Sequence, residues 1–219
     1  QAAKGDIVLL HGCCHNPTGA DLSLDDWSKI IDLLEEKELF PFVDIAYQGF
    51  GDGLEEDAAA VRLIAKRLPE LVVAASCSKN VGLYRERVGA AILVGRNEAE
   101  TALAFGQLTS VIRSNYSMPP DHGANATEIV ITDSALSSSW REELEAMRVR
   151  MVGLRQEFSE AMRKRSNSDR FDYIATQKGL FSRLPLSTEQ IETLRDDHAI
   201  YIVGDGRINV AGLPEEGIE

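Results

Sequence analysis

Six polar side chains that could take part in chemistry follow three apolar segments of the chain. They are Asn16, Asp44, Tyr47, Ser76, Ser78 and Lys79. The apolar segments, residues 7–10, 42–43 and 71–75, are typical of buried strands. Because ligands bind beyond the carboxyl ends of the strands in an open parallel sheet, we expect these side chains to converge in one crevice. An amide, an acid, a phenol, two hydroxyls and an amine suit a charged aromatic cofactor that carries a phosphate.

The elements that must position these side chains predict an α/β fold, with a mainly parallel sheet flanked by helices. Ser23 and Asp26 have the spacing of a helix start, and an apolar stripe continues to about residue 37. A second helix is predicted over residues 57–68 and a further strand over residues 88–94. Alternation of strands and helices is the pattern of a parallel sheet.

A long helix is predicted in the middle of the chain. We expect a helix over residues 97–113, a loop over 114–120, and then a helix that Ser139 and Glu142 cap. The apolar stripe of this last helix is Leu144, Met147, Met151, Leu154, Phe158 and Met162. The charged stretch 163–170 ends it.

The final part of the chain has an α+β pattern. Short strands are predicted over residues 173–176, 180–184, 199–203 and 207–211, around a helix over residues 187–198. The sequence therefore predicts a large domain over residues 1–138, a connecting helix over 139–168 and a smaller α+β domain over 169–219.

The composition limits the classes of function. The 219 residues have a formal net charge of −12, so we expect neither nucleic acid nor an anionic membrane as a partner. Three cysteines, two of them adjacent, form no disulfide framework and favour a reduced, cytoplasmic setting. Because the chain starts at Gln1, close to its first strand, and ends soon after its last, we expect it to be a piece of a longer protein.

Lys79 allows more than one interpretation. A lysine partly withdrawn from water can act as a nucleophile or a base, whereas a lysine in a solvated loop does neither. Ser76 and Lys79 also match the S-x-x-K pattern of serine acyl-enzymes, although the partner motifs S-D-N and K-T-G are absent from the sequence. A serine hydrolase that uses Ser76 and Lys79 is a remote alternative.

The sequence does not predict a metal site. In an extended segment His11, Cys13 and His15 share one face and Cys14 lies on the other, a spacing that matches no common zinc pattern. His11 can instead orient a nearby acid. Three arginines are candidates for binding phosphate or carboxylate, namely Arg87, Arg113 and Arg207.

Five motifs occur in the order in which one enzyme family has them. They are HGCCHNPTG from His11, DIAY from Asp44, SCSKNVGLYRER from Ser76, RSNYS from Arg113 and GRINVA from Gly206. On these residues the chain resembles the class I aspartate and aromatic amino-acid aminotransferases, which are pyridoxal-phosphate enzymes of fold type I. The resemblance runs nearly the whole chain, and it implies that residues 1–138 form part of a cofactor-binding large domain.

The resemblance also implies a role for each cofactor-side residue. Lys79 would form the internal aldimine with pyridoxal 5'-phosphate and later move a proton between the substrate Cα and the cofactor C4′. Asp44 would pair with the pyridine nitrogen, with His11 supporting it from behind. Tyr47 and Asn16 would bond the ring hydroxyl oxygen.

On the phosphate and substrate side, the resemblance implies that Ser76, Ser78 and Arg87 bind the phosphate. Arg207 would bind the α-carboxylate of the substrate, and Phe181 would lie near the substrate. Arg113 would reach the neighbouring site across a homodimer interface to a second carboxylate.

The implied function is transfer of an amino group between an aromatic amino acid or aspartate and 2-oxoglutarate, by a ping-pong cycle. Met118 stands where dicarboxylate enzymes of the family often carry Asn, which favours aromatic substrates. The upstream phosphate loop of the family has no counterpart here. An alternative is therefore a catalytically incomplete fragment that acts only as a folding or dimerisation unit.

Overall fold

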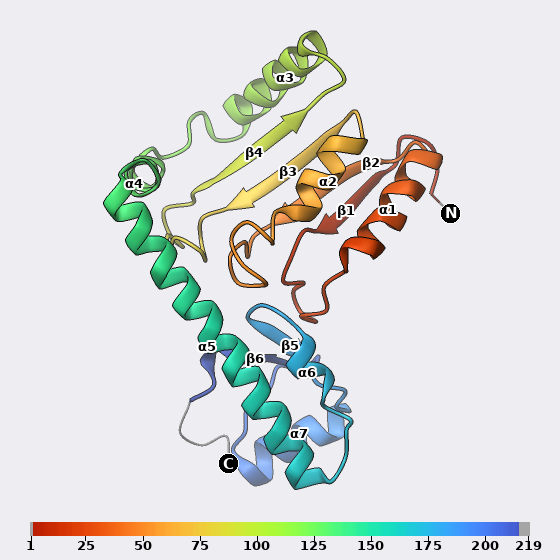
Figure 1. Ribbon diagram of the computed structural model, residues 1–219, viewed down its shortest axis with the longest axis vertical. Coiled ribbons are helices and arrows are strands. Elements are labelled where there is room, and N and C mark those ends of the chain that lie inside the picture. The colour runs from red at the N-terminus through yellow and green to blue at the C-terminus, as the bar shows by residue number, and fades with distance from the viewer. Residues whose placement is uncertain (1, 215–219) are drawn as a thin grey trace.

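The computed structural model describes residues 2–214 (Figure 1). The strands are β1 Ile7–His11, β2 Phe40–Ile45, β3 Leu71–Ser76, β4 Gly89–Val94, β5 Phe181–Arg183 and β6 Arg207–Asn209. The helices are α1 Leu24–Glu36, α2 Ala59–Arg67, α3 Glu98–Tyr116, α4 His122–Thr132, α5 Ser134–Ser166, α6 Tyr173–Thr176 and α7 Thr188–His198, with a 3-10 turn, η1, at Val210–Gly212. Among these residues no helix is long and apolar enough to cross a membrane.

The main sheet has the order β1-β2-β3-β4, and helices flank it (Figure 1). β1, β2 and β3 are parallel, whereas β4 runs antiparallel to β3. Along β2 buried residues alternate with half-buried ones, so Val43 and Ile45 face the core while Asp44 points the other way. The predicted α/β class with a mainly parallel sheet is confirmed.

Helix α1 forms as its cap and its apolar stripe predict. The Ser23 hydroxyl accepts a hydrogen bond from the Asp26 N–H at 3.2 Å and donates one to the Asp26 carboxylate at 2.6 Å. Trp27, Ile31 and Leu34 are buried on one side of the helix and pack in the core with β2 and β3. The helix therefore covers one face of the sheet.

The long helix α5 starts earlier than predicted. Asp133 is its cap, because a carboxylate oxygen of Asp133 accepts hydrogen bonds from the N–H groups of Ala135 and Leu136, each at 2.9 Å. The predicted cap at Ser139 with Glu142 is wrong, since both lie inside the helix. Helix α4, which the sequence did not predict, precedes it directly.

The buried face of α5 also differs from the predicted stripe. Met147 is 38% exposed, whereas the buried positions are Leu144, Met151, Leu154, Arg155 and Ser159. An arginine and a serine thus occupy core positions that hydrophobicity alone would not assign.

Two predicted strands in the last part of the chain are wrong. Residues 173–176 form the short helix α6, because Phe171 and Ile174, three residues apart, are buried together against Leu184. Residues 199–203 form no strand, since Ala199 adopts a left-handed conformation that ends α7 and Tyr201 is 80% exposed. Strand β6 is shorter than expected, because η1 follows it at Val210.

The helix predicted over residues 187–198 and the strand at 180–184 are confirmed. Ser187 and Gln190 form a complete capping box at the start of α7. The β5–β6 pair forms a second sheet, near the lower half of α5 (Figure 1). The division of the chain into parts 1–138, 139–168 and 169–219 stays a prediction, and residues 215–219 lie outside the described residues.

Replacing Gly49 with alanine should destabilise the protein. Gly49 has φ +97°, and a Cβ atom there would lie 2.5 Å from Cδ2 of the buried Leu144 in α5. We expect the free energy of unfolding to fall by about 1–3 kcal/mol, measured by urea denaturation.

Gly106→Ala is the matched control for Gly49→Ala. Gly106 lies inside α3, and a Cβ atom there meets no atom within 4 Å. This change should stabilise by about 0.5–1 kcal/mol, because alanine favours the helix. Equal effects of the two substitutions would contradict the packing between Gly49 and Leu144.

Candidate active site

The carboxyl ends of β1, β2 and β3 meet at one edge of the sheet. His11 is the register partner of Asp44, and Asp44 is the partner of Ala74, two residues before Ser76. Figure 1 shows these ends pointing toward the half of the molecule that contains β5 and β6. The predicted convergence of polar groups at this edge therefore has the required geometry.

Tyr47 lies at the centre of the group. Its hydroxyl accepts a hydrogen bond from the Asn16 side-chain amide at 3.1 Å, and the Lys79 ammonium nitrogen lies 4.6 Å from the centroid of its ring. Burial raises the pKa of the Tyr47 phenol, and the Asn16 hydrogen bond acts against that rise. The structure thus brings the amide, the phenol and the amine together.

Asp44 and Lys79 have no oppositely charged partners in the part of the chain that the structure describes. No hydrogen bond or ion pair reaches the Asp44 carboxylate or the Lys79 nitrogen there, and the Lys79 nitrogen lies over the rings of Tyr47 and Tyr84. Both side chains are half-buried. Because unpaired charges are costly away from water, the arrangement suits a ligand that offers an acceptor for an amine and a cation for an acid.

His11 stands beside Asp44 in the sheet register, so the two side chains leave the same face of neighbouring strands. The His11 ring is 4.5 Å from the His15 ring, centroid to centroid, and His15 Nδ1 is 2.7 Å from the Thr18 hydroxyl. Burial, followed by the nearby His11, lowers the pKa of His15.

The candidate phosphate residues lie where β3 turns back into β4. The Ser78 N–H donates to the Ser76 hydroxyl at 3.2 Å, and Ser76 is the register partner of Gly89, two residues after Arg87. Arg87 adopts a positive φ of 57°, and its exposed guanidinium donates to the Tyr84 carbonyl at 3.2 Å. The hydroxyls of Ser76 and Ser78 and the guanidinium of Arg87 thus lie at the end of β3 and in the connection that leads to β4.

The candidate substrate residues approach from the second sheet. The Phe181 ring meets the Tyr47 ring edge-on, with centroids 6.5 Å apart. The Arg207 guanidinium carbon is 5.7 Å from the Phe181 centroid. Arg207, Phe181, Tyr47 and Lys79 therefore form a continuous row of neighbours.

Arg113 does not join this group. It lies in the last turn of α3, is exposed, and donates to the Ser117 hydroxyl at 2.8 Å. In Figure 1 α3 lies beyond β4, at the opposite side of the sheet from β1. Among residues 2–214 no hydrogen bond, ion pair or ring contact links Arg113 to Asp44 or Lys79.

Sequence reasoning missed two features beside Lys79. The Tyr84 ring centroid is 5.5 Å from the Lys79 nitrogen, although an exposed aromatic in a loop gives no sequence signal of this contact. Asn80 donates to the Gln48 carbonyl at 3.2 Å, and its own carbonyl accepts from Trp140 Nε1 at 2.6 Å. These bonds fasten the Lys79 loop to the segment after β2 and to α5.

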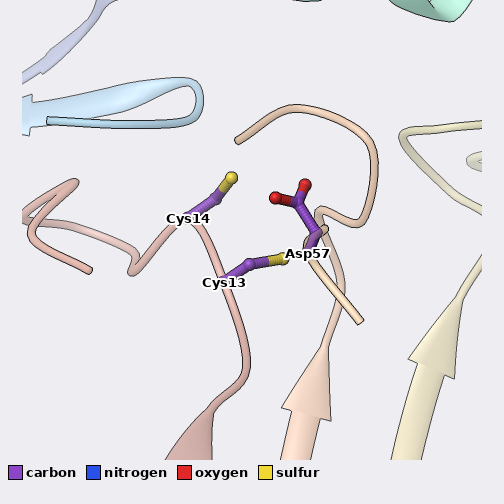
Figure 2. A group of neighbouring side chains, drawn as sticks. All are labelled: Cys13, Cys14 and Asp57. Carbon is purple, nitrogen blue, oxygen red and sulfur yellow. The ribbon is translucent and has the colours of Figure 1, made fainter. Parts of the chain in front are cut away.

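A group of metal-ligating atoms lies next to the site. Figure 2 shows the thiols of Cys13 and Cys14 beside the Asp57 carboxylate, with the ligand atoms within 4.8 Å of one another. The Asp57 carboxylate already accepts backbone N–H bonds from Gly49, Gly51 and Asp52, at 2.8, 2.9 and 2.8 Å. A hydrogen bond with Cys13, followed by burial, raises the pKa of Cys14, which favours the protonated thiol. The geometry gives Asp57 a structural role in the glycine-rich loop.

Comparison with known proteins identifies the family. The model of the family "aminotransferase class I and II" matches residues 1–219. The chain belongs to this aminotransferase family. It is 51% identical to an aromatic-amino-acid aminotransferase of Paracoccus denitrificans, over 99% of this chain and 55% of that protein. It is 44% identical to the aspartate aminotransferase of Escherichia coli K12, over 100% of this chain and 55% of that protein.

A solved structure supports the same assignment. An aromatic-amino-acid aminotransferase from Burkholderia pseudomallei, described as covalently bound to pyridoxal phosphate, superposes with a TM-score of 0.95. The two are 42% identical, and the match covers 99% of this chain and 54% of that one. The aminotransferase chain thus spans about half the length of the relatives it matches.

Asn16→Ala should raise the pKa of Tyr47 in the aminotransferase chain. The amide hydrogen bond is the influence that lowers this pKa, so its removal leaves burial and the nearby acidic groups to raise it. A titration of tyrosine labelled with ¹³C at Cζ, followed by NMR, measures the shift. The Tyr173 resonance should titrate as before, and an unchanged or lowered pKa of Tyr47 would contradict the contact.

Asp57→Asn should destabilise the glycine-rich loop. Asparagine offers one side-chain oxygen in place of two, so at least one of the three loop N–H groups, two of which are buried, loses its acceptor. We expect the free energy of unfolding to fall by about 1–3 kcal/mol in urea. Glu56→Gln, at an exposed neighbouring position, should change it far less, and a similar loss there would refute the role of Asp57.

Proposed function

We propose that this chain carries active-site residues of a pyridoxal-phosphate-dependent aminotransferase. One observation carries the proposal. The Asp44 carboxylate and the Lys79 ammonium, both without a charged partner among residues 2–214, belong to the ends of adjacent strands, and Lys79 lies over the ring of Tyr47, which Asn16 bonds. The family match and the relatives named above support it.

The donor set fits the chemistry of pyridoxal phosphate. Asp44 can hold a proton on a pyridine nitrogen, while the phenol of Tyr47 and the amide of Asn16 can bond a ring oxygen. Ser76, Ser78 and Arg87 offer hydroxyl and guanidinium donors to a phosphate. When bound, the cofactor supplies an electron sink for the negative charge at the substrate carbon that loses a proton.

The remaining residues act on the substrate. The Arg207 guanidinium binds the α-carboxylate in a bidentate way, and Phe181 bounds the space beside it. Lys79 would take the proton from the substrate α-carbon and give it to the cofactor carbon bonded to the amino nitrogen, so that the amino group leaves the substrate. His11, the register partner of Asp44 on the neighbouring strand, would support the Asp44 carboxylate from behind.

The proposed substrates are an aromatic amino acid or aspartate, together with 2-oxoglutarate, in a ping-pong cycle. Relatives named for both amino-acid classes support this range. Arg113, exposed and remote from the site of its own chain, reaches the site of a second copy in a homodimer. A cytoplasmic location agrees with three free cysteines, of which Cys13 and Cys14 are buried.

A second candidate is a catalytically incomplete folding or dimerisation unit. The observation that favours it is the coverage of about half of each relative. A serine hydrolase has less support, because the Lys79 nitrogen lies over the Tyr47 ring and the Ser76 hydroxyl accepts the Ser78 N–H.

The proposal predicts a visible absorbance that depends on Lys79. Pyridoxal phosphate added to the protein should give a band that shifts with pH, and Lys79→Ala should abolish it. Lys66→Ala, at an exposed position on α2, should leave the band intact. A band that survives Lys79→Ala would overturn the assignment.

Measurement of amino transfer distinguishes the second candidate, the incomplete unit, from the proposed enzyme. Amino transfer by the 219-residue chain itself would exclude the incomplete unit. A band and turnover in the protein of full natural length, with neither in this chain, would support the incomplete unit for the chain alone.

A further inference from the structure

Helix α5 carries a buried arginine that has no carboxylate within ion-pair distance among residues 2–214. Arg155 is 1% exposed. Its guanidinium donates to the carbonyls of Ile174, Lys178, Gly179 and Phe181, at 3.2, 3.2, 2.7 and 2.8 Å, and to the Ser182 hydroxyl at 2.6 Å. Burial lowers the pKa of Arg155 to about 10, so the side chain stays charged at neutral pH. Neutral oxygens supply all the hydrogen bonds that compensate for the loss of water around this charge, and Asp21 adds a favourable charge without a direct bond.

Most of these oxygens belong to one short segment, residues 177–182, which leads into β5. The segment is bonded within itself as well, because the Ser182 hydroxyl donates to the Gln177 side-chain oxygen at 2.6 Å. The planar guanidinium of Arg155 thus donates hydrogen bonds to three backbone carbonyls of this segment. A guanidinium, with five N–H donors in a fixed fork, is suited to this task.

The segment also rests on the turn that contains Asn16. The Lys178 N–H donates to the Gly19 carbonyl at 2.8 Å. A Cβ atom on Gly19 would lie 2.6 Å from the Phe181 carbonyl oxygen, so the two backbones are in close contact. The segment is therefore held between α5 and the Asn16 turn.

The position of strand β6 depends on that of β5, because the two strands are paired. Phe181 pairs with Asn209 and Arg183 with Arg207, and the Leu184 N–H donates to the Gly206 carbonyl at 2.8 Å. A shift of residues 181–183 therefore moves the backbone of Arg207 and the Phe181 ring together.

We propose that Arg155 is a positioning residue that sets Phe181 and Arg207 for binding of the substrate carboxylate. This inference rests on the proposed function, and it adds a residue that lies outside the candidate site. Arg155 acts through residues 177–182 and β5, and it touches neither cofactor nor substrate. The planar guanidinium of Arg155 is required as well as its positive charge, because the ammonium group of a lysine carries its three donors on a single nitrogen atom.

The test compares Arg155→Lys with Ser182→Ala in the protein of full natural length, loaded with pyridoxal phosphate. Arg155→Lys keeps the positive charge and loses the planar guanidinium. Ser182→Ala removes one hydroxyl acceptor of Arg155, and it is the milder variant to use if Arg155→Lys fails to fold. Arg163→Lys is the control, since Arg163 lies on the same helix, is exposed, and pairs with Asp172.

We expect Arg155→Lys to raise KM for the amino-acid substrate about tenfold or more, and Ser182→Ala to raise it by a smaller factor. The kcat at saturation and the visible band that depends on Lys79 should change little, because the cofactor side is untouched. Arg163→Lys should match the unaltered protein.

Hydrogen exchange of the cofactor-free protein gives a readout independent of activity. Amides of residues 177–183 and 206–209 should exchange faster in both variants, while those of β1, β2 and β3 keep their rates. The exchange rates test the positioning role of Arg155 even if the unaltered protein shows no visible band. Absence of the band would refute the proposed function, not the effect of Arg155 on residues 177–183.

Two results would overturn the positioning role. One is a KM within about twofold of the unaltered protein in both variants, with unchanged exchange at residues 177–183. The other is a joint loss of the band, of kcat and of exchange protection across the sheet, which indicates a general structural role.

Discussion

The pairing register of three parallel strands determines which edge of the sheet carries the cofactor side and where Asp44 lies on it. Along β2 the side chains alternate, so burying Val43 and Ile45 against the core directs Asp44 to the opposite face. A slip of one residue would bring Asp44 into the core and turn Val43 outward. The apolar packing that holds the sheet together therefore also fixes the acid beside His11, without any bond dedicated to that purpose.

Beyond the strand ends, the backbone follows irregular paths, and a few polar side chains hold it. Asp57 collects amides of the glycine-rich loop, Asn80 links the Lys79 loop to two other segments, and Arg155 collects carbonyls before β5. Each of these side chains replaces the regular hydrogen bonds that a helix or strand would provide. The site thus combines a regular sheet with loops that depend on individual residues.

The sequence was sufficient for the elements whose signals are periodic and local. The strands β1 to β4, the cap of α1 and the helix α7 could be predicted, because spacing and hydrophobicity agree there. The start of α5 could not, because both Asp133 and Ser139 satisfy the pattern of a cap and only the three-dimensional structure selects between them. Short apolar runs such as residues 173–176 fit either a strand or a helical turn.

The same limit applies to the candidate site. Convergence of Asn16, Tyr47 and Lys79 follows from the parallel sheet, so it could be predicted before the fold was known. Arg155 could not, because an arginine in a charged helix has the same sequence pattern whether water or carbonyl oxygens surround it.

The close contact between Gly19 and Phe181 joins two parts of the chain that are far apart in the sequence. Contacts of this kind require closure of a long loop, whereas β1, α1 and β2 close short ones. The entropic cost of closing this contact is therefore higher than that of the contacts within the sheet. The row from Lys79 to Arg207 combines both kinds of contact, since Tyr47 and Lys79 follow strands of the main sheet whereas Phe181 and Arg207 lie in β5 and β6.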